Sequence, residues 1–126
     1  MTLAKIRHQR GQTAFHAGAA AEYRIAQDYV RRGYDVAATR WRGAAGEIDL
    51  ILRDGPRLVF VEVKQSRTLA QAAASLSRRQ MQRIARSAQA FVADEPSGSL
   101  TDMRIDVALL DRAGDVQIIE NAFGQC

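Results

Sequence analysis

The segment 46–64, GEIDLILRDGPRLVFVEVK, decides the fold of this chain. It consists of two apolar runs separated by Asp54 and Gly55, a dipeptide suited to the positive φ angles of tight turns. The two runs therefore predict a pair of antiparallel strands that fold back on each other. Such a hairpin places residues from its two ends close together in space.

The second strand of this hairpin has two faces of different character. Successive side chains point to opposite sides of a strand, so one face consists of valines alone. The other face begins with Leu58 and Phe60 and ends with Glu62 and Lys64. Packing gives no reason for this change from apolar to ionic residues, which indicates a functional site. The alternative is a plain Glu62–Lys64 ion pair on an exposed face.

The first strand carries charged residues at its matching end. Glu47 and Asp49 alternate with apolar residues, and pairing of the strands would bring them near Glu62 and Lys64. Carboxylates a few ångströms apart repel one another at low dielectric, so one ammonium group leaves the site negative. Hard oxygen ligands in that number suit Mg²⁺ or Mn²⁺ better than zinc or copper.

The basic residues favour a phosphate-containing partner. The chain has 18 Lys and Arg residues and a formal net charge of +4, and only Lys5 and Lys64 are lysines. A compact ammonium can approach a water molecule or a phosphate more closely than a guanidinium can, which makes the lysine at position 64 informative. The cations occur in groups around the acidic site, as nucleic-acid binding requires, and the alternative is a basic surface without function. These groups are Lys5, Arg7 and Arg10; Arg31 and Arg32; Arg40 and Arg42; and Arg78, Arg79, Arg83 and Arg86.

Length and composition predict one globular domain over residues 1–126, with a flexible N-terminal segment over 1–12. The sequence shows no membrane span and no secretory signal, so we expect a soluble cytoplasmic protein. Cys126 is the single cysteine, which excludes a cysteine-based metal site. The two histidines, His8 and His16, both precede the first strand and do not support a zinc site or a histidine base.

Two helices are predicted beside the hairpin. The first spans about 13–33 and has Glu22 in the middle of its apolar stripe, where a carboxylate needs a partner. Glu22 could pair with an arginine, cap the backbone or belong to the acidic site. The second helix begins after Ser77, which forms a capping box with Gln80, and its apolar stripe ends at Val92. Its arginines lie mainly on the other faces.

The remaining segments complete an alternating α/β pattern. A first strand is expected over 34–41, and two more over 103–110 and 116–120. Trp41 could stack on a nucleotide base or pack at the edge of the core. The polar connection 65–76 has no strand period and is interpreted as a mobile flap, and Asp106 as an outward-facing polar residue.

The order of these residues resembles a known superfamily. A helix with Glu22, then Asp49 on one strand and Glu62-x-Lys64 on the next, is similar to the PD-(D/E)XK nucleases. More closely, four segments resemble the YraN-like family of small bacterial proteins, distant relatives of archaeal Holliday-junction resolvases. These segments are GYDVAATRWR, GEIDLI, LVFVEVK and ENAF, and the likeness covers about 18–123.

The resemblance implies an α/β fold with a restriction-endonuclease-like αβββαβ core, a central mixed sheet of about five strands flanked by two helices. It also implies an Mg²⁺- or Mn²⁺-dependent endonuclease that hydrolyses DNA, including branched or junction DNA. The resolvases act as dimers, so a homodimer is the expected assembly if an exposed strand edge allows pairing. Family members often have arginine two positions after the lysine, whereas here Gln65 and Ser66 precede Arg67, which leaves the role of Arg67 open.

By matching position, Asp49 and Glu62 would bind the metal with the Val63 backbone carbonyl, and Glu22 would be an additional or water-mediated ligand. Lys64 would orient the attacking water and stabilise charge on the phosphate. Glu47 would support these residues from the same strand face or pair with Arg42. Six arginines are the candidate nucleic-acid contacts: Arg40, Arg42, Arg67, Arg78, Arg79 and Arg83.

Two other classes of protein remain compatible with the same residues. One is a nucleic-acid-binding module that keeps a nuclease fold without catalysis. The other is a protein-interaction domain in which the acidic cluster is a structural network of ion pairs. Metal binding separates the interaction domain from the other two classes, and DNA cleavage separates the enzyme from the binding module.

Overall fold

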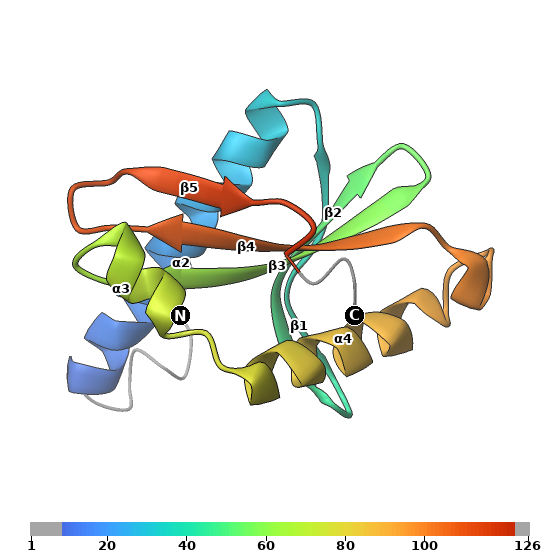
Figure 1. Cartoon of the computed structure of the whole chain (residues 1–126), viewed down its shortest axis with the longest axis horizontal. Helices are drawn as coiled ribbons and strands as arrows, with labels where there is room; N and C mark the ends of the chain where they lie inside the picture. Colours follow the sequence, from blue (N-terminus) through green and yellow to red (C-terminus); the bar gives the residue numbers. More distant parts are fainter. Residues whose placement is uncertain (1–8, 123–126) are drawn as a thin grey trace.

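The computed structural model describes residues 9–122, with side chains from Gly18 onward. The chain forms one mixed sheet of five strands with helices packed on both sides (Figure 1). The elements are α2 (Gln9–Arg31), β1 (Asp35–Gly43), β2 (Gly46–Asp54), β3 (Arg57–Gln65), α3 (Leu69–Ala74), α4 (Arg78–Val92), η1 (Gly98–Leu100), β4 (Met103–Leu110) and β5 (Val116–Ile119). The expected α/β class is confirmed, and the arrangement is consistent with a restriction-endonuclease-like core.

The strands lie in sequence order, β1-β2-β3-β4-β5. Neighbouring strands are antiparallel except β3 and β4, which are parallel and are connected by the segment that contains α3 and α4. A parallel pair needs such a crossover, because the chain must return to the same end of the sheet. This crossover places α4 against the face of β2 and β3.

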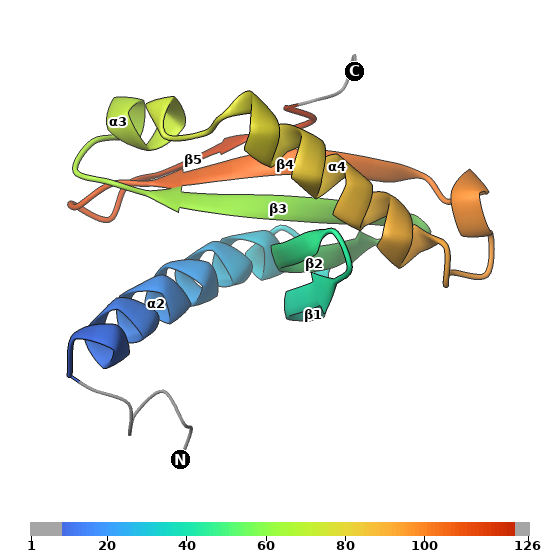
Figure 2. The same cartoon turned by 90° about the horizontal axis from the view of Figure 1, so that it is seen from below.

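Each face of the sheet has its own apolar core. Phe60 on β3 packs with Ile84 and Ala88 of α4 on one side, whereas Val61 packs with Ile25 and Tyr29 of α2 on the other. Figure 2 shows the resulting three layers, with α3 and α4 on one side of the sheet and α2 on the opposite side. The expected alternation of faces along β3 is therefore confirmed.

Local sequence signals account for the turn and the helix start. The β-hairpin turn is formed by Gly55 and Pro56, and Gly55 has a φ of +62°, which glycine adopts without a steric penalty. Ser77 caps α4 by accepting a hydrogen bond from the Gln80 backbone N–H at 3.1 Å, and the Gln80 side chain accepts one from the Ser77 N–H at the same distance. The capping box was expected from the sequence, and so was a turn at this point, but the expected turn residues Asp54 and Gly55 lie one position before the observed pair.

Two segments that were expected to be flexible include helical residues. The predicted N-terminal segment 1–12 lies largely outside the described residues, but α2 already includes residues 9–12 and runs through Gly18. The connection 65–76, interpreted as a flap, contains the helix α3. Thr68 starts this helix, because its side-chain oxygen accepts a hydrogen bond from the Gln71 N–H at 3.1 Å.

The interpretation of Asp106 as an outward-facing residue is wrong. Its side chain is fully buried and accepts a hydrogen bond from the Tyr29 hydroxyl at 2.7 Å. Arg104 donates two more hydrogen bonds, at 2.8 and 2.9 Å, and the Asn121 backbone N–H donates a fourth at 2.9 Å. A carboxylate can be buried where several donors satisfy it, and here Tyr29 and Asn121 reach Asp106 from other parts of the chain.

Within the described part of the chain, none of the helices combines the length and the apolar composition that crossing a bilayer would require.

Candidate active site at the strand fork

The candidate site lies where β2 and β3 separate. The pair Leu50–Val61 is the end of their pairing. Beyond it, the first residues of β2 pair with β1 alone, and the last residues of β3 pair with β4 alone. At this fork the Asp49 Oδ2 atom accepts a hydrogen bond from the Val63 backbone N–H at 2.9 Å. We call this region, with Glu47 and Asp49 on β2 and residues 62–64 on β3, the strand fork. It brings together the charged ends of the hairpin.

The divergence also changes the direction of side chains on β2. Leu50 and Leu52 pack against α2, and simple alternation would place Ile48 beside them. Instead, Ile48 belongs to the core under α4. Simple alternation, which would group these three residues on one face, therefore fails at Ile48, beyond the last residue of β2 that pairs with β3.

Glu62 and Lys64 form an ion pair that is largely shielded from water. The Lys64 Nζ atom is 3.2 Å from Glu62 Oε2, and the two side chains are 16% and 8% exposed, respectively. Because Val63 packs against the α2 side, Glu62 and Lys64 face the α4 side of the sheet. The exposed ion pair considered as an alternative is thus not what the structure contains.

Two carboxyl groups of the strand fork hold protons more strongly than usual. Burial raises the pKa of Glu62 to about 7, and the Asp49 carboxylate adds to this rise while Lys64 opposes it. Burial also raises the pKa of Asp49, against the effect of the Val63 N–H. The two carboxyl groups share a hydrogen bond that raises the pKa of Glu62 and lowers that of Asp49. An additional positive charge would relieve this repulsion.

Glu22 approaches the strand fork from α2. Its Oε1 atom accepts a hydrogen bond from Arg40 Nε at 2.7 Å, so of the three explanations considered for Glu22 the structure contains the arginine pairing. Burial raises the pKa of Glu22, Arg40 opposes this rise, and the charges of Asp49 and Glu47 add to it. Glu22 therefore interacts electrostatically with the site. Arg40 has a φ of +49°, an uncommon conformation for a residue other than glycine.

Glu47 pairs with Arg42, as one of its two expected roles requires. The Arg42 guanidinium donates a hydrogen bond to Glu47 Oε2 at 3.4 Å, and the Arg42 side chain is 80% exposed. Glu47 also raises the pKa values of Asp49 and Glu22 through its charge. Trp41, by contrast, packs edge-on against Phe91 at 5.2 Å between ring centroids, so it belongs to the edge of the core.

The oxygen atoms at the strand fork fit a hard divalent cation. Asp49, Glu62 and the Val63 carbonyl supply the oxygen donors that Mg²⁺ and Mn²⁺ prefer, and the two carboxyl groups repel each other without a cation. Among the side chains of residues 18–122, however, no three Asp, Glu, His or Cys groups are close enough to hold an ion between them. In this structure Glu22 therefore does not complete a set of three protein ligands.

The arginines of α4 form a separate basic surface. This helix has four arginines and no acidic residue, and its arginines make no ion pairs with the other described residues. Arg83 crosses over Gly46 at the start of β2, where an added Cβ would lie 2.8 Å from Arg83 Cδ. The absence of a side chain at Gly46 permits this close approach, so Arg83 of α4 packs directly beside the strand fork.

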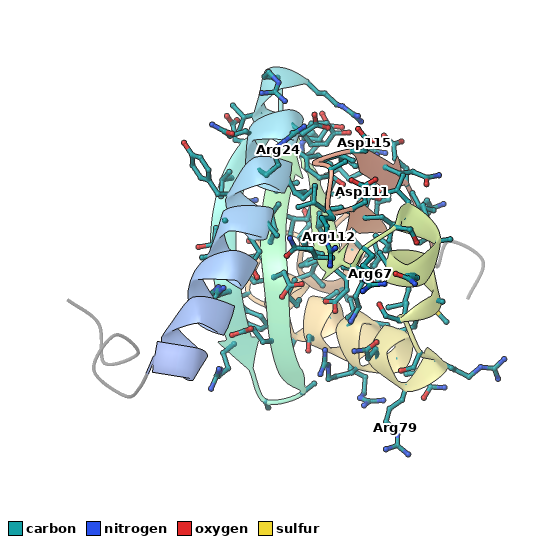
Figure 3. The ribbon with its side chains drawn as sticks, turned by 90° about the vertical axis from the view of Figure 1, so that its left-hand side faces the viewer. Arg24, Arg67, Arg79, Asp111, Arg112 and Asp115 are labelled. Atoms are coloured by element: carbon teal, nitrogen blue, oxygen red, sulfur yellow. The ribbon has the colours of Figure 1, made fainter. Side chains whose placement is uncertain are left out.

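Arg67 lies on a more mixed surface. Its backbone carbonyl accepts a hydrogen bond from the Arg112 N–H at 3.3 Å, and both side chains are exposed. Figure 3 shows the two arginines near each other with Asp111 and Asp115 close by, whereas Arg79 projects from the end of α4. Sequence reasoning missed Arg112, because only the folded structure brings the β4–β5 turn beside the residue that follows β3.

These features define the chain as a small α/β protein with a mixed five-stranded sheet and a buried cluster of carboxylates and one lysine. It belongs to the uncharacterised protein family UPF0102, whose model matches residues 21–110. A UPF0102 protein of Ruegeria pomeroyi is 56% identical over 115 residues, which is 91% of this chain and 94% of the relative. A second, of Cereibacter sphaeroides, is 57% identical over 113 residues, covering 90% and 97%. A third, of Roseobacter denitrificans, is 49% identical over 125 residues, covering 99% and 97%.

Proposed function

We propose that this protein is an Mg²⁺-dependent endonuclease of the PD-(D/E)XK type that hydrolyses phosphodiester bonds of DNA. The observation that carries the proposal is the arrangement of Asp49, Glu62 and Lys64 at the strand fork. A carboxyl pair with raised pKa values beside an ammonium group is costly to bury, and perturbed groups of this kind concentrate at functional sites. Mn²⁺ would serve in place of Mg²⁺.

Asp49, Glu62 and the Val63 carbonyl would hold the cation, and Glu22 would contribute after its pairing with Arg40 loosens. When bound, Mg²⁺ polarises the phosphate and lowers the pKa of a water molecule at the site. The Val63 N–H fixes Asp49 at 2.9 Å, so this carboxylate is already oriented before binding. Such preorganisation reduces the cost of assembling the site.

Lys64 has a separate role in this proposal. Its ammonium group lies 3.2 Å from Glu62, at the rim of the same cluster, and is 16% exposed. From there it would orient the attacking water and stabilise the negative charge that develops on the phosphate in the transition state. A guanidinium would be too wide to replace it at this position.

The arginines of α4 would bind the DNA backbone. Arg78 and Arg79 are exposed and unpaired among the described residues, and α4 offers no acidic side chain that would repel phosphate. Glu62 and Lys64 face the same side of the sheet as α4. A duplex lying along α4 would therefore present its phosphates to the catalytic cluster. Arg40, Arg42 and Arg67 are further candidate contacts, and a homodimer remains a prediction.

The direct test is a cleavage panel. Single-stranded, duplex, flap and four-way junction DNA are incubated with the protein and Mg²⁺ or Mn²⁺, beside the Asp49→Asn variant, which keeps an oxygen acceptor for the Val63 N–H. Cleavage by the wild type and its loss in the variant support the endonuclease. Binding without cleavage of any substrate would favour a non-catalytic nucleic-acid-binding module, and absence of both would favour a protein-interaction domain.

A further inference from the structure

A concave feature adjoins the strand fork on the side away from α4. It is a pocket of about 340 Å³ between α2 and β1, and Glu22 and Arg40 form part of its wall. This volume is within the range of pockets that bind small molecules. The lining residues are Ala19, Glu22, Tyr23, Ala26, Thr39 and Arg40. The Glu22–Arg40 ion pair, which lies beside the candidate active site, is therefore also part of the pocket wall.

Tyr23 is the unusual residue in this wall. Its side chain is 65% exposed, although it directly follows the half-buried Glu22 on α2. The hydroxyl group makes no hydrogen bond and the ring no aromatic contact with the other described residues. An exposed aromatic ring beside a pocket offers a flat apolar surface to a ligand with a ring system. Sequence periodicity gave no sign of this, because the ring lies outside the apolar stripe of the helix.

The rest of the pocket suits one nucleotide. Ala19 and Ala26 lie on α2 one turn to either side of the Glu22–Tyr23 pair, and their small side chains leave space beside the Tyr23 ring. Thr39 adds a hydroxyl group, and Arg40 adds a guanidinium that is 31% exposed. An apolar floor with a cation at one end matches a nucleobase that is attached to a phosphate.

We propose that this pocket binds one unpaired base of a DNA strand next to the cleavage site, with the base stacked on Tyr23. This proposal rests on the proposed function and specifies its substrate. The pocket is lined by α2 and β1, and α2 lies on the opposite side of the sheet from α4 (Figure 2). A stiff duplex along α4 therefore does not turn into the pocket. A flexible single strand can pass the strand fork and reach it. The preferred substrate is thus DNA with single-stranded character at the cut.

The test measures binding in EDTA, without cleavage. The probe is a duplex with a short single-stranded overhang that carries 2-aminopurine, a base whose fluorescence falls on stacking, and a blunt duplex of the same length serves as the comparison. The variants are Tyr23→Ala and Tyr23→Phe. Val30→Ala is the matched control, because Val30 is also on α2 and is 51% exposed, but it does not line the pocket.

We expect Tyr23→Ala to lose about tenfold in affinity for the overhang probe, together with the fluorescence change, and to bind blunt duplex as the wild type does. Tyr23→Phe should keep both properties, because the stacking ring remains. An equal loss on both probes, no loss on either, or the same loss in Val30→Ala would overturn the proposal.

A free nucleotide is the other source of a base. Deoxyadenosine monophosphate that competes as strongly as the overhang probe would reassign the pocket to free nucleotides and overturn the proposal for a DNA strand. These measurements need no turnover, so they are separate from the test of the endonuclease. Failure of the wild type to cleave any DNA would remove the proposed function, whereas loss of overhang selectivity concerns Tyr23 alone.

Discussion

The carboxylate of Asp49 takes the place of a backbone acceptor for Val63. Beyond the pair Leu50–Val61 the strands β2 and β3 separate, and Asp49 Oδ2 accepts the Val63 N–H hydrogen bond at 2.9 Å. An unsatisfied N–H at this point would be costly, so the interaction stabilises the fork as well as orienting the carboxylate. One side chain thus has a structural and a proposed functional role, and substitutions can separate the two.

Asp49→Asn and Asp49→Ala should differ in stability but not in metal binding. Asparagine can still accept the Val63 hydrogen bond, whereas alanine leaves the N–H without this partner, so Asp49→Ala should be less stable than Asp49→Asn by about 1 kcal/mol. Both variants should lose at least about tenfold in Mn²⁺ affinity, because the anionic ligand is gone. Urea unfolding and calorimetric titration measure the two effects. Equal Mn²⁺ affinity in the wild type and Asp49→Asn would remove the metal-site hypothesis.

The raised pKa of Glu62 predicts how stability depends on pH. The folded pKa of about 7 lies above the ordinary value of 4.5, so the folded protein binds the proton more tightly than the unfolded chain. The contribution of Glu62 protonation to the free energy of unfolding is fully present below pH 4.5 and is lost as the pH rises through about 7. We therefore compare the free energy of unfolding of Glu62→Gln with that of the wild type. The difference should shift in favour of the variant by at least about 1 kcal/mol when the pH is raised from 5 to 8.

Denaturant unfolding of the metal-free proteins at both pH values measures this difference. Glu95 provides a control of opposite sign, because the hydrogen bond from Arg53 lowers its pKa. Its contribution is present above the ordinary carboxyl pKa and is lost as the pH falls, so Glu95→Gln should not gain stability at pH 8. Parallel pH profiles for the wild type and Glu62→Gln would contradict the assignment of a raised pKa to Glu62.

Changes at Lys64 should separate catalysis from binding. Lys64→Ala keeps both carboxylates and removes a positive charge that competes with the cation, so Mn²⁺ affinity should be unchanged or higher. Cleavage should fall by at least about a hundredfold, because the ammonium acts on charge that develops only in the transition state. Lys64→Arg should not restore the rate. Single-turnover cleavage at saturating Mg²⁺ is the measurement, and near-normal rates in both variants would leave Lys64 as an ion-pair partner only.

Replacement of Arg78 and Arg79 by glutamine should weaken DNA binding and reduce its dependence on salt. Each phosphate contact that is lost lowers the slope of log affinity against log salt by about one, so the double variant should lose about two. Arg31 and Arg32 offer a matched pair of substitutions, since both are exposed and pair with Asp28. The same loss of slope in that control would show a general effect of net charge rather than a surface on α4.

Asp106→Ala should destabilise the protein by about 3 kcal/mol or more. The substitution leaves the buried Arg104 with only the more distant and exposed carboxylate of Glu120, at 3.8 Å, and removes the acceptor of the Tyr29 hydroxyl. Asp115→Ala, on the exposed β4–β5 turn, is the control and should change stability by less than about 0.5 kcal/mol. Urea unfolding of both variants provides the comparison, and similar values would show that the buried network contributes little.

The hairpin and the two faces of its second strand follow from the local order of residues alone. The strict alternation in LVFVEVK leaves one register in which the valines and the Leu58–Phe60 side are both buried, because a shift of one residue would exchange the faces. The capping box at Ser77 and the turn glycine Gly55 are likewise local signals, since the groups that interact are within three residues of each other. Local chemistry is readable wherever the partners are neighbours in the chain.

The partners of the charged residues, by contrast, depend on how the helices and strands pack together. Asp106 lies between apolar residues in sequence, and its burial depends on Tyr29, which is 77 positions away. Glu22 pairs with Arg40 because α2 packs beside β1, and Asp49 bonds to Val63 because β2 and β3 separate at that point. A charge is stable in the interior only where donors or opposite charges surround it, and packing of whole elements sets those surroundings. The alternation along a strand determines the face to which a side chain points, but the fold determines what it meets there.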